Sequence, residues 1–195
     1  MLISLGPQAF ISPAPVLLVG TYDASGRPNI MTAAWGGLCC SQPPCLAVSL
    51  RRSSWTCRSL QLKQAFTVSI PGRNMVGQAD FAGLVSGRQE DKFQSLGLTP
   101  QAGEHVDAPF VAECPVVLEL LLRHTLEFGS HIQFVGEIMD VKVNRDCLSP
   151  EGLPDPALID ALSFAPLTKE YYGIGEFVAR AFAVGKTVKR NVQEG

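Results

Sequence analysis

The sequence predicts a small antiparallel β-barrel with helical insertions. Six short runs rich in apolar residues have the length and the turn-forming boundaries of strands, whereas only three short segments have the apolar spacing of helices. The chain has 195 residues, which is enough for one well-buried core and too few for two ordinary domains. We therefore expect a single, mainly β domain over residues 1–195.

The first three strands are expected at residues 15–23, 30–40 and 45–51. The first run is followed by an Asp-x-x-Gly turn, which favours a strand over a helix. The pair Gly36-Gly37 weakens a helix by about 1 kcal/mol per glycine and allows close approach of backbone or ligand. The alternation of strands and turns in this region predicts an antiparallel meander.

Helix caps, turns and the spacing of apolar residues predict the helices and strands after residue 53. Ser53 or Ser54 can cap a helix, and a tight turn at residues 128–131 joins two long strand patterns. The predicted helices span 54–64, 74–86 and 90–96, and the further strands span 65–70, 116–127 and 132–143. A polar loop covers 99–109, an irregular segment with one helical turn near 157–162 covers 148–170, and a last apolar run covers 177–184.

The composition is that of a folded protein without a general affinity for nucleic acid. Hydrophobic residues make up 46% and charged residues 17% of the chain, and the net charge is −2. An acidic balance gives no electrostatic reason to bind nucleic acid. The pair Arg51-Arg52 is local, which favours a small anionic partner.

The sequence also predicts a cytoplasmic protein that does not enter a membrane. The N-terminus lacks the basic start and apolar core of a signal peptide, and no apolar run approaches the ~20 residues that cross a bilayer. Six cysteines form neither C-x-x-C pairs nor a dense disulfide pattern, so we expect reduced thiols. His105 and His124 have no flanking ligands at metal spacing, and no metal is expected.

Two polar stretches at neighbouring strand ends predict the binding site. Residues 27–37 offer small residues, an amide, a hydroxyl and an indole, which suit a flat heteroaromatic ring with polar edges. Residues 51–56 offer guanidinium and hydroxyl groups at a predicted helix start, which suit a phosphate. A ring and a phosphate side by side indicate flavin mononucleotide (FMN).

Seven short motifs in order resemble the flavin reductase-like proteins, which have the FMN-binding split-barrel fold. Within that family the motifs are most similar to the flavoredoxins. They are Pro28-Asn29-x-Met31-Thr32-Ala33-Ala34-Trp35, Pro43-Pro44 before a strand ending at Ser49, Arg51-x-x-x-x-Thr56, Ser86-Gly87-Arg88, Asp91-Lys92-Phe93, Gly129-Ser130-His131 before a strand ending Val135-Gly136-Glu137, and Tyr172-Gly173-Ile174-Gly175. Two features depart from the pattern: Ser130 replaces the usual acidic residue, and no nicotinamide-binding fingerprint is evident.

The resemblance implies a six-stranded antiparallel Greek-key split barrel with helical insertions. It also implies a homodimer with one FMN near each subunit boundary, and transfer of electrons or hydride through that flavin. On this basis the chemistry takes place at the flavin, and no protein side chain is assigned a catalytic role.

The phosphate is assigned to Arg51, Ser53 and Thr56, with Arg52 and Ser54 as neighbouring candidates. The plain alternative is that Ser53 only caps the helix and that the arginines are a solvated pair.

The ring is assigned to Asn29, Thr32, the backbone around Ala33 and Ala34, and Trp35. Asn29 as a turn residue and Trp35 as a core side chain are the alternatives. Cys40 or Cys39 can also line the ring, although buried structural thiols are common.

Three further residues complete the predicted site. Lys92 is expected near N1 and C2=O of the flavin, where it would tune the reduction potential; a surface lysine is the alternative. His131 can reach the phosphate or the ring edge, or bond nearby backbone as a turn histidine. Phe164 can stack over a flavin, including the partner subunit's, or act as a hydrophobic plug.

The sequence thus predicts an FMN-dependent carrier that passes electrons between redox partners, with a redox protein or NAD(P)H as the electron donor. Two alternatives stay open: an NAD(P)H-dependent flavin or small-molecule reductase, and a non-redox flavin or haem storage or sensing module. No G-x-S-x-G elbow, P-loop or dinucleotide fingerprint supports another chemistry.

Overall fold

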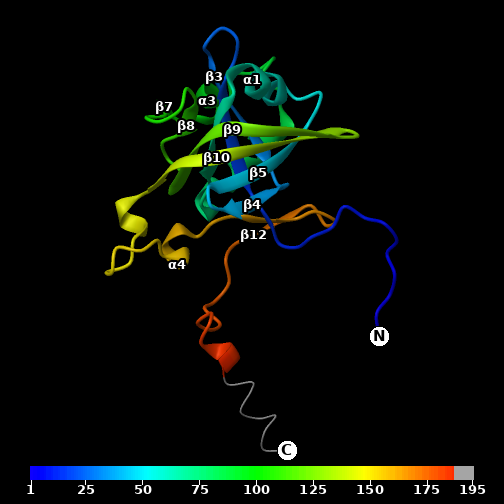
Figure 1. Cartoon of the computed structure of the whole chain (residues 1–195), viewed down its shortest axis with the longest axis vertical. Coiled ribbons are helices and arrows are strands. Elements are labelled where there is room, and N and C mark those ends of the chain that lie inside the picture. The colour runs from blue at the N-terminus through cyan, green and yellow to red at the C-terminus, as the bar shows by residue number, and fades with distance from the viewer. Residues whose placement is uncertain (187–195) are drawn as a thin grey trace, which may run out of the picture.

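The body of the chain is an antiparallel sheet of seven strands, described by a computed structural model over residues 1–186 (Figure 1). From one edge to the other the strands are β3 (Pro28–Ala33), β2 (Leu17–Tyr22), β6 (Ala65–Ile70), β9 (Val116–Phe128), β10 (His131–Val143), β5 (Pro44–Arg51) and β4 (Gly36–Ser41). Since β3 and β4 do not pair, the barrel is split between them. The mainly β split-barrel prediction is confirmed.

The predicted strand 30–40 is two strands that lie at opposite edges of the sheet. The chain leaves β3 after Ala33 and crosses through Ala34 and Trp35 to β4. The Ser49 amide donates a 2.8 Å hydrogen bond to the Trp35 carbonyl, which holds this crossing against β5. The meander prediction is wrong here, and the sheet has seven strands instead of six.

Glycine makes the crossing possible. A Cβ atom on Gly36 would lie 2.7 Å from Leu17 Cδ1 and 2.9 Å from the Ala47 carbonyl oxygen. Any side chain would therefore force the edge strand away from the barrel. The sequence prediction recognised close approach at Gly36-Gly37 without its consequence for the sheet order.

The core fills the inside of the barrel, as the alternation of the strands requires. Its largest fully buried side chains include Phe66 of β6, Phe134 of β10 and Leu50 of β5. A second cluster lies between the outer face and the helices, and it contains Leu18, Ile30 and Phe93 among others. Burial on both faces explains why several strands read as continuous apolar runs.

The three predicted helices are present, with short adjustments. They are α1 (Trp55–Lys63), α2 (Val76–Leu84), preceded by the 3₁₀ turn η1 (Arg73–Met75), and α3 (Lys92–Leu96). The Ser54 hydroxyl caps α1 by accepting a 3.1 Å hydrogen bond from the Cys57 amide. Helix α1 packs on β2, β3, β5 and β6, whereas α2 and α3 pack on β3.

Smaller elements complete the fold. The predicted loop 99–109 contains strand β7 (Pro100–Ala102) and leads into β8 (Pro109–Val111), a hairpin that the sequence prediction missed. Strands β1 (Ala14–Pro15), β11 (Ser163–Ala165) and β12 (Glu170–Tyr172) form a separate three-stranded sheet. The remaining short helices are η2 (Arg145–Cys147), α4 (Pro156–Ile159), which is the predicted helical turn, and η3 (Val184–Lys186).

Two terminal arms leave the body, as Figure 1 shows. The C-terminal arm, residues 173–186, carries Phe177 and Phe182, which are 78% and 95% exposed. The N-terminal arm, residues 1–11, exposes Leu2, Ile3 and Phe10 in the same way. No helix within residues 1–186 is long and apolar enough to span a bilayer.

Candidate functional site

The end of β5 and the start of α1 form one side of a cavity of about 230 Å³. The nine-residue helix α1 presents its N-terminal amides there, and the positive end of its dipole favours an anion. Twelve residues line the cavity: Met31, Arg51, Ser53, Ser54, Trp55, Thr56, Gly83, Leu84, Val85, Ser86, Gly87 and Lys92. We name it the phosphate cavity, because hydroxyl, guanidinium and ammonium groups converge in it.

Thr56 lies in the wall of the phosphate cavity and is only 1% exposed. Its Oγ1 accepts a 2.9 Å hydrogen bond from Asn29 Nδ2. Because this oxygen already accepts from an amide, its own proton is free to be donated to a phosphate oxygen. Asn29 is thus placed behind the phosphate cavity and acts on Thr56, whereas the sequence prediction put it beside the ring.

Gly87 packs closely against the side chain of Asn29. A Cβ atom at Gly87 would lie 2.0 Å from Asn29 Oδ1, so the loop backbone needs glycine at this position. The Gly87 carbonyl accepts a 2.8 Å hydrogen bond from Arg27, which also pairs with Asp23 at 3.3 Å. Hydrogen bonds to Ser25 and Arg27 lower the pKa of Asp23 although burial, the largest single influence, acts in the opposite direction.

Lys92 is a buried cation in the wall of the same cavity. Its side chain is 3% exposed and Nζ donates a 2.6 Å hydrogen bond to the Ala82 carbonyl, so it is not a surface lysine. Burial lowers the pKa of Lys92 to about 8. An anion in the cavity would offset this cost of charging the ammonium group. Lys92 thus adds a buried cation to the wall that Arg51 and Gly83 also line, whereas the sequence prediction put it near N1 and C2=O of the ring.

A second cavity of about 240 Å³ adjoins the first at the split in the barrel. It is lined by Met31, Thr32, Ala33, Ala34, Trp35, Ser49, Arg51, Gly83 and His131. We name it the ring cavity. Met31, Arg51 and Gly83 line both cavities, so a ligand can extend from one into the other. Thr32, Ala33 and Trp35, which the sequence prediction assigned to the ring, therefore lie together in the wall of this cavity.

Trp35 and His131 bound the ring cavity together. Their ring centroids are 4.6 Å apart and the planes are tilted by 34°. His131 Nδ1 lies 2.8 Å from the Ser130 hydroxyl, which fixes the imidazole where the family pattern has an acidic residue. Burial and then the nearby Arg51 lower the pKa of His131, so the imidazole is neutral at pH 7. Trp35 is partly exposed and does not belong to the core.

Phe164 borders a third, smaller cavity, which shares Thr32, Ala34 and Gly83 with the ring cavity. Its lining comprises Val16, Thr32, Ala34, Gly83, Phe164 and Tyr171. Phe164 packs against Tyr171 with ring centroids 5.4 Å apart. The Thr32 hydroxyl donates to the Ala79 carbonyl of α2, so its methyl group is left to contact a ligand. The third cavity is therefore mainly apolar and adjoins the ring cavity.

Two candidates lie away from these three cavities. Cys40 is exposed on the edge strand β4, opposite Cys45 near the hairpin tip, and neighbouring Cys39 is also exposed. Arg52 turns away from the phosphate cavity to pair with Glu127 at 2.8 Å and to donate to the Gly129 carbonyl. Arg51 is thus the guanidinium that remains for a phosphate.

The sequence prediction missed Trp55. This first residue of α1 lines the phosphate cavity, and its indole Nε1 is buried without a hydrogen-bond partner among residues 1–186. A buried N–H group needs an acceptor, and a phosphate oxygen would supply one. The signal available in the sequence was the position of Trp55 directly after the capping serines.

The residues present fit a flavin nucleotide. The phosphate cavity combines a helix N-terminus, a free hydroxyl, two cations and an unpartnered N–H group. The ring cavity, at the other end, is a slot between small residues and an indole. The described residues contain no group of three or more histidine, cysteine, aspartate or glutamate side chains placed to hold a metal ion.

Comparison with known proteins decides the family. The model of the flavin reductase-like domain matches residues 11–164. The chain belongs to the flavin reductase-like family. This membership confirms the resemblance drawn from the seven motifs and supports a flavin as the cofactor.

Two solved structures and one curated protein are similar to this chain. The flavoredoxin of Desulfovibrio vulgaris (Miyazaki F) is 57% identical with a TM-score of 0.91, covering 95% of this chain and 100% of that chain. The flavoredoxin from Methanosarcina acetivorans is 32% identical with a TM-score of 0.90, covering 96% and 99%. The high molecular weight rubredoxin of Moorella thermoacetica is 32% identical over 108 residues, which cover 53% of this chain and 44% of that protein.

Proposed function

We propose that this chain is an FMN-binding electron carrier that exchanges electrons with redox partners through a non-covalently bound flavin. The observation that carries the proposal is the continuity of the phosphate cavity with the ring cavity through Met31, Arg51 and Gly83. Similarity to two flavoredoxins and to a rubredoxin supports an electron-transfer role. The flavin itself supplies the redox chemistry.

The chain's own residues bind and orient the cofactor. Thr56, with its hydroxyl proton free, and Ser53 donate to the phosphate, and Arg51 and Lys92 balance its charge. The backbone at Ala33 and Ala34 faces the ring edge, and Trp35 covers one boundary. His131 is neutral and stacked on Trp35, so it contributes shape and a hydrogen-bonding edge instead of charge.

The protein is proposed to be a homodimer with FMN near the subunit interface. Apolar side chains on both terminal arms cannot be buried within one copy, since the arms run away from the body (Figure 1). The edge strand β4 exposes Leu38 at 75%, beside the ring cavity's Trp35. A second copy that brings its arms onto this edge would cover both apolar surfaces in one isologous contact.

The proposed location is the cytoplasm. All six cysteines are free thiols in the structure, and four of them are buried. Reduced thiols suit a reducing compartment. No partner among nucleic acids is proposed, given the net charge of −2.

An NAD(P)H-dependent reductase is the second candidate. It is favoured by the apolar cavity beside Ala34, Phe164 and Tyr171, which leaves the outer side of the ring slot accessible. Stopped-flow mixing of the FMN-loaded protein with NADH, NADPH or a reduced small iron–sulfur protein separates the two functions. A carrier is reduced fast by the protein donor and slowly by either nicotinamide. Fast, saturable bleaching by NADH or NADPH would assign the reductase function instead.

A further inference from the structure

Three of the six cysteines lie on one hairpin, formed by the edge strand β4 and its neighbour β5. Cys40 of β4 and Cys45 of β5 are directly opposite each other, close to the Gln42-Pro43 turn. Cys39 is the extra residue at an irregularity in the strand pairing, just before Cys40. Cys39 and Cys40 are exposed, whereas Cys45 is buried. The hairpin thus places a solvent-accessible thiol opposite a covered one.

The register of the two strands gives Cys40 and Cys45 the spacing that a disulfide needs. Residues directly opposite in an antiparallel pair have Cα atoms about 4.5–5.5 Å apart, and their side chains share one face of the sheet. Disulfides span Cα separations of about 4.4–6.8 Å. The backbone around the two thiols, which are free in the structure, can therefore accommodate a bond between them.

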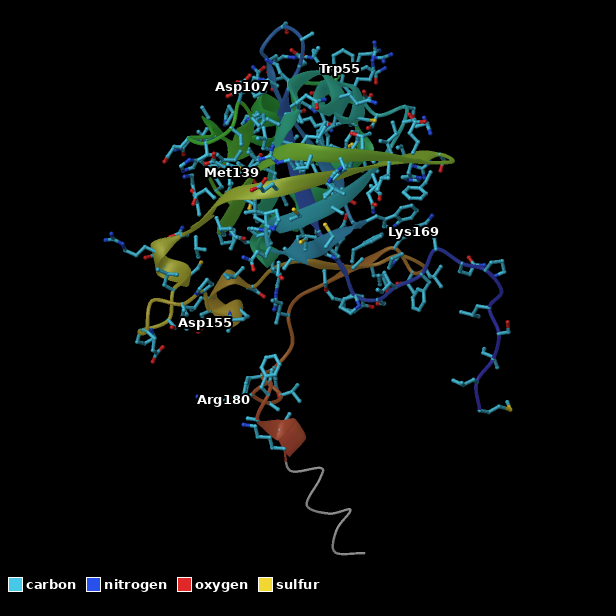
Figure 2. All side chains as sticks on the ribbon, in the orientation of Figure 1. Trp55, Asp107, Met139, Asp155, Lys169 and Arg180 are labelled. Atoms are coloured by element: carbon cyan, nitrogen blue, oxygen red, sulfur yellow. The ribbon has the colours of Figure 1, made fainter. Side chains whose placement is uncertain are left out.

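The thiol pair lies on the opposite face of the hairpin from the apolar residue assigned to the dimer contact. Leu46 of β5 belongs to the core, so the neighbouring Cys45 points to the outer face. Leu38 is opposite Leu46 and Cys40 is opposite Cys45, so the outer face carries the thiols and the core side carries Leu38. The C-terminal arm, marked by Arg180 in Figure 2, runs away from the body. A small molecule can therefore reach exposed Cys40.

The surroundings of the two thiols differ in a way that sets the order of their reactions. Cys45 is opposite Glu137 of β10 on its other side, and this carboxylate pairs with Arg123 at 2.6 Å. Burial raises the pKa of Cys45, and the nearby Cys40 acts in the same direction. Because the thiolate is the attacking species, the exposed Cys40 reacts with a small molecule first and Cys45 reacts second.

We propose that Cys40 and Cys45 form a reversible dithiol site that reacts with small-molecule disulfides. The Cys40 thiolate attacks one sulfur of the small disulfide, which forms a mixed disulfide and releases one small thiol. Cys45 then loses its proton and attacks the Cys40 sulfur, which releases the second small thiol and forms the Cys40–Cys45 bond. One small disulfide is reduced to two thiols, two cysteines are oxidised to one cystine, and the two cysteine protons pass to the released thiols.

The new bond joins the strand pair that also carries part of the ring cavity. At the other end of this pair, the Ser49 amide of β5 donates to the Trp35 carbonyl just before β4. Oxidation at the hairpin tip thus acts on the strand that begins beside Trp35. In a reducing compartment such disulfides are transient and report the redox state, which is the role that this site suits.

The test treats the purified full chain with oxidised glutathione under nitrogen, unfolds it and alkylates the remaining free thiols. The tryptic fragment 1–51 holds Cys39, Cys40 and Cys45 and no other cysteine, so mass spectrometry of this fragment counts the reacted thiols. Untreated protein should carry three alkyl groups there. Treated protein should carry one, with the loss of two hydrogen atoms, and dithiothreitol should restore all three. Sequencing the fragment should place the remaining alkyl group on Cys39.

Three variants assign the bond. Cys40→Ser and Cys45→Ser should each abolish it, whereas Cys39→Ser, the matched control at a neighbouring exposed thiol, should still form it. A bond that persists in Cys45→Ser would join Cys39 to Cys40 and overturn the inference. A lasting glutathione adduct, a disulfide between two chains or an unreacted wild type would overturn it as well. Fragment sequencing of the wild type decides the outcome where a variant does not fold.

Discussion

Asn29 and Thr56 are joined by a hydrogen bond of 2.9 Å from the Asn29 amide to the Thr56 hydroxyl, and both side chains are buried. This bond links strand β3 to the first turn of α1. Within residues 1–186 the Thr56 hydroxyl accepts this bond and donates to no protein group, so its proton is available for a ligand. The phosphate cavity is therefore prepared by a residue that does not itself line it.

Removing either partner should weaken FMN binding. We expect Thr56→Ala and Asn29→Ala each to weaken FMN binding by about 1–3 kcal/mol. Thr56→Ala removes the hydroxyl that donates to the phosphate, and Asn29→Ala removes the amide that orients this hydroxyl. The double variant should lose less than the sum, because Asn29 acts through Thr56. Calorimetric titration with FMN measures all three, with exposed Thr125→Ala as control. Additive losses would show that Asn29 contacts the cofactor independently.

Gly87 should not tolerate a methyl group. The added Cβ would meet Asn29 Oδ1 at 2.0 Å, so Gly87→Ala must displace Asn29 or the loop at a cost of about 1–3 kcal/mol. We expect a lower Tm and weaker FMN binding together. Gly37→Ala is the control, because no atom lies within 4 Å of a Cβ there. Equal thermal stability of the two variants would contradict the packing described.

FMN affinity should fall as the pH rises above about 8. Burial lowers the pKa of Lys92 to about 8 in the flavin-free protein, so at higher pH the lysine has lost its proton and binding the phosphate must restore it. The dissociation constant should then rise by up to about tenfold per pH unit. Lys92→Met should abolish this dependence between pH 7 and 10, whereas Lys63→Met should retain it. A pH-independent wild type would show that Lys92 does not face the phosphate.

Lys92 should adjust the flavin potential without determining it. A charge about 4 Å from the reduced flavin contributes roughly 4 kcal/mol at an effective dielectric constant of 20, or at most about 90 mV on a two-electron couple. We expect Lys92→Met to lower the potential by less than this limit in a spectroelectrochemical titration. A fall of about 90 mV would mean that Lys92 contacts the ring directly and not the phosphate in the cavity whose wall it lines.

His131 should titrate below its ordinary range. Burial, followed by the charge of Arg51, lowers its pKa, and stacking on Trp35 maintains the burial. The imidazole resonances in an NMR titration should therefore shift below pH 6.5 in wild type and closer to it in Trp35→Ala. Because the folded state disfavours the proton, His131 lowers stability as the pH falls through this range and not as it rises. A pKa above 6.5 would contradict the geometry.

Much of the fold follows from local sequence signals. The Ser54 cap, the periodicity of α1 and the long hairpin β9–β10 agree with the structure because each depends on residues close in the chain. Local signals do not reveal that residues 30–40 form two strands, because this division depends on the close packing of Gly36 against Leu17 and Ala47. Only the packed barrel reveals that contact.

The site residues show the same difference between local signals and contacts that join distant segments. Arg51, Ser53 and Thr56 were predicted because a strand end and a capped helix start lie next to each other in sequence. The partnership of Asn29 with Thr56, the fit of Gly87 against Asn29 and the burial of Lys92 each join distant segments. Trp55 was missed because helix position alone does not reveal an unpartnered indole N–H.

The most direct test of this account is the visible spectrum of the purified protein, followed by titration with FMN after the cofactor has been removed. We predict the absorption of bound oxidised flavin without additions, and uptake of one FMN per chain by the flavin-free protein. A colourless, folded protein that takes up no FMN from an excess would contradict the proposal that the adjoining cavities hold this cofactor.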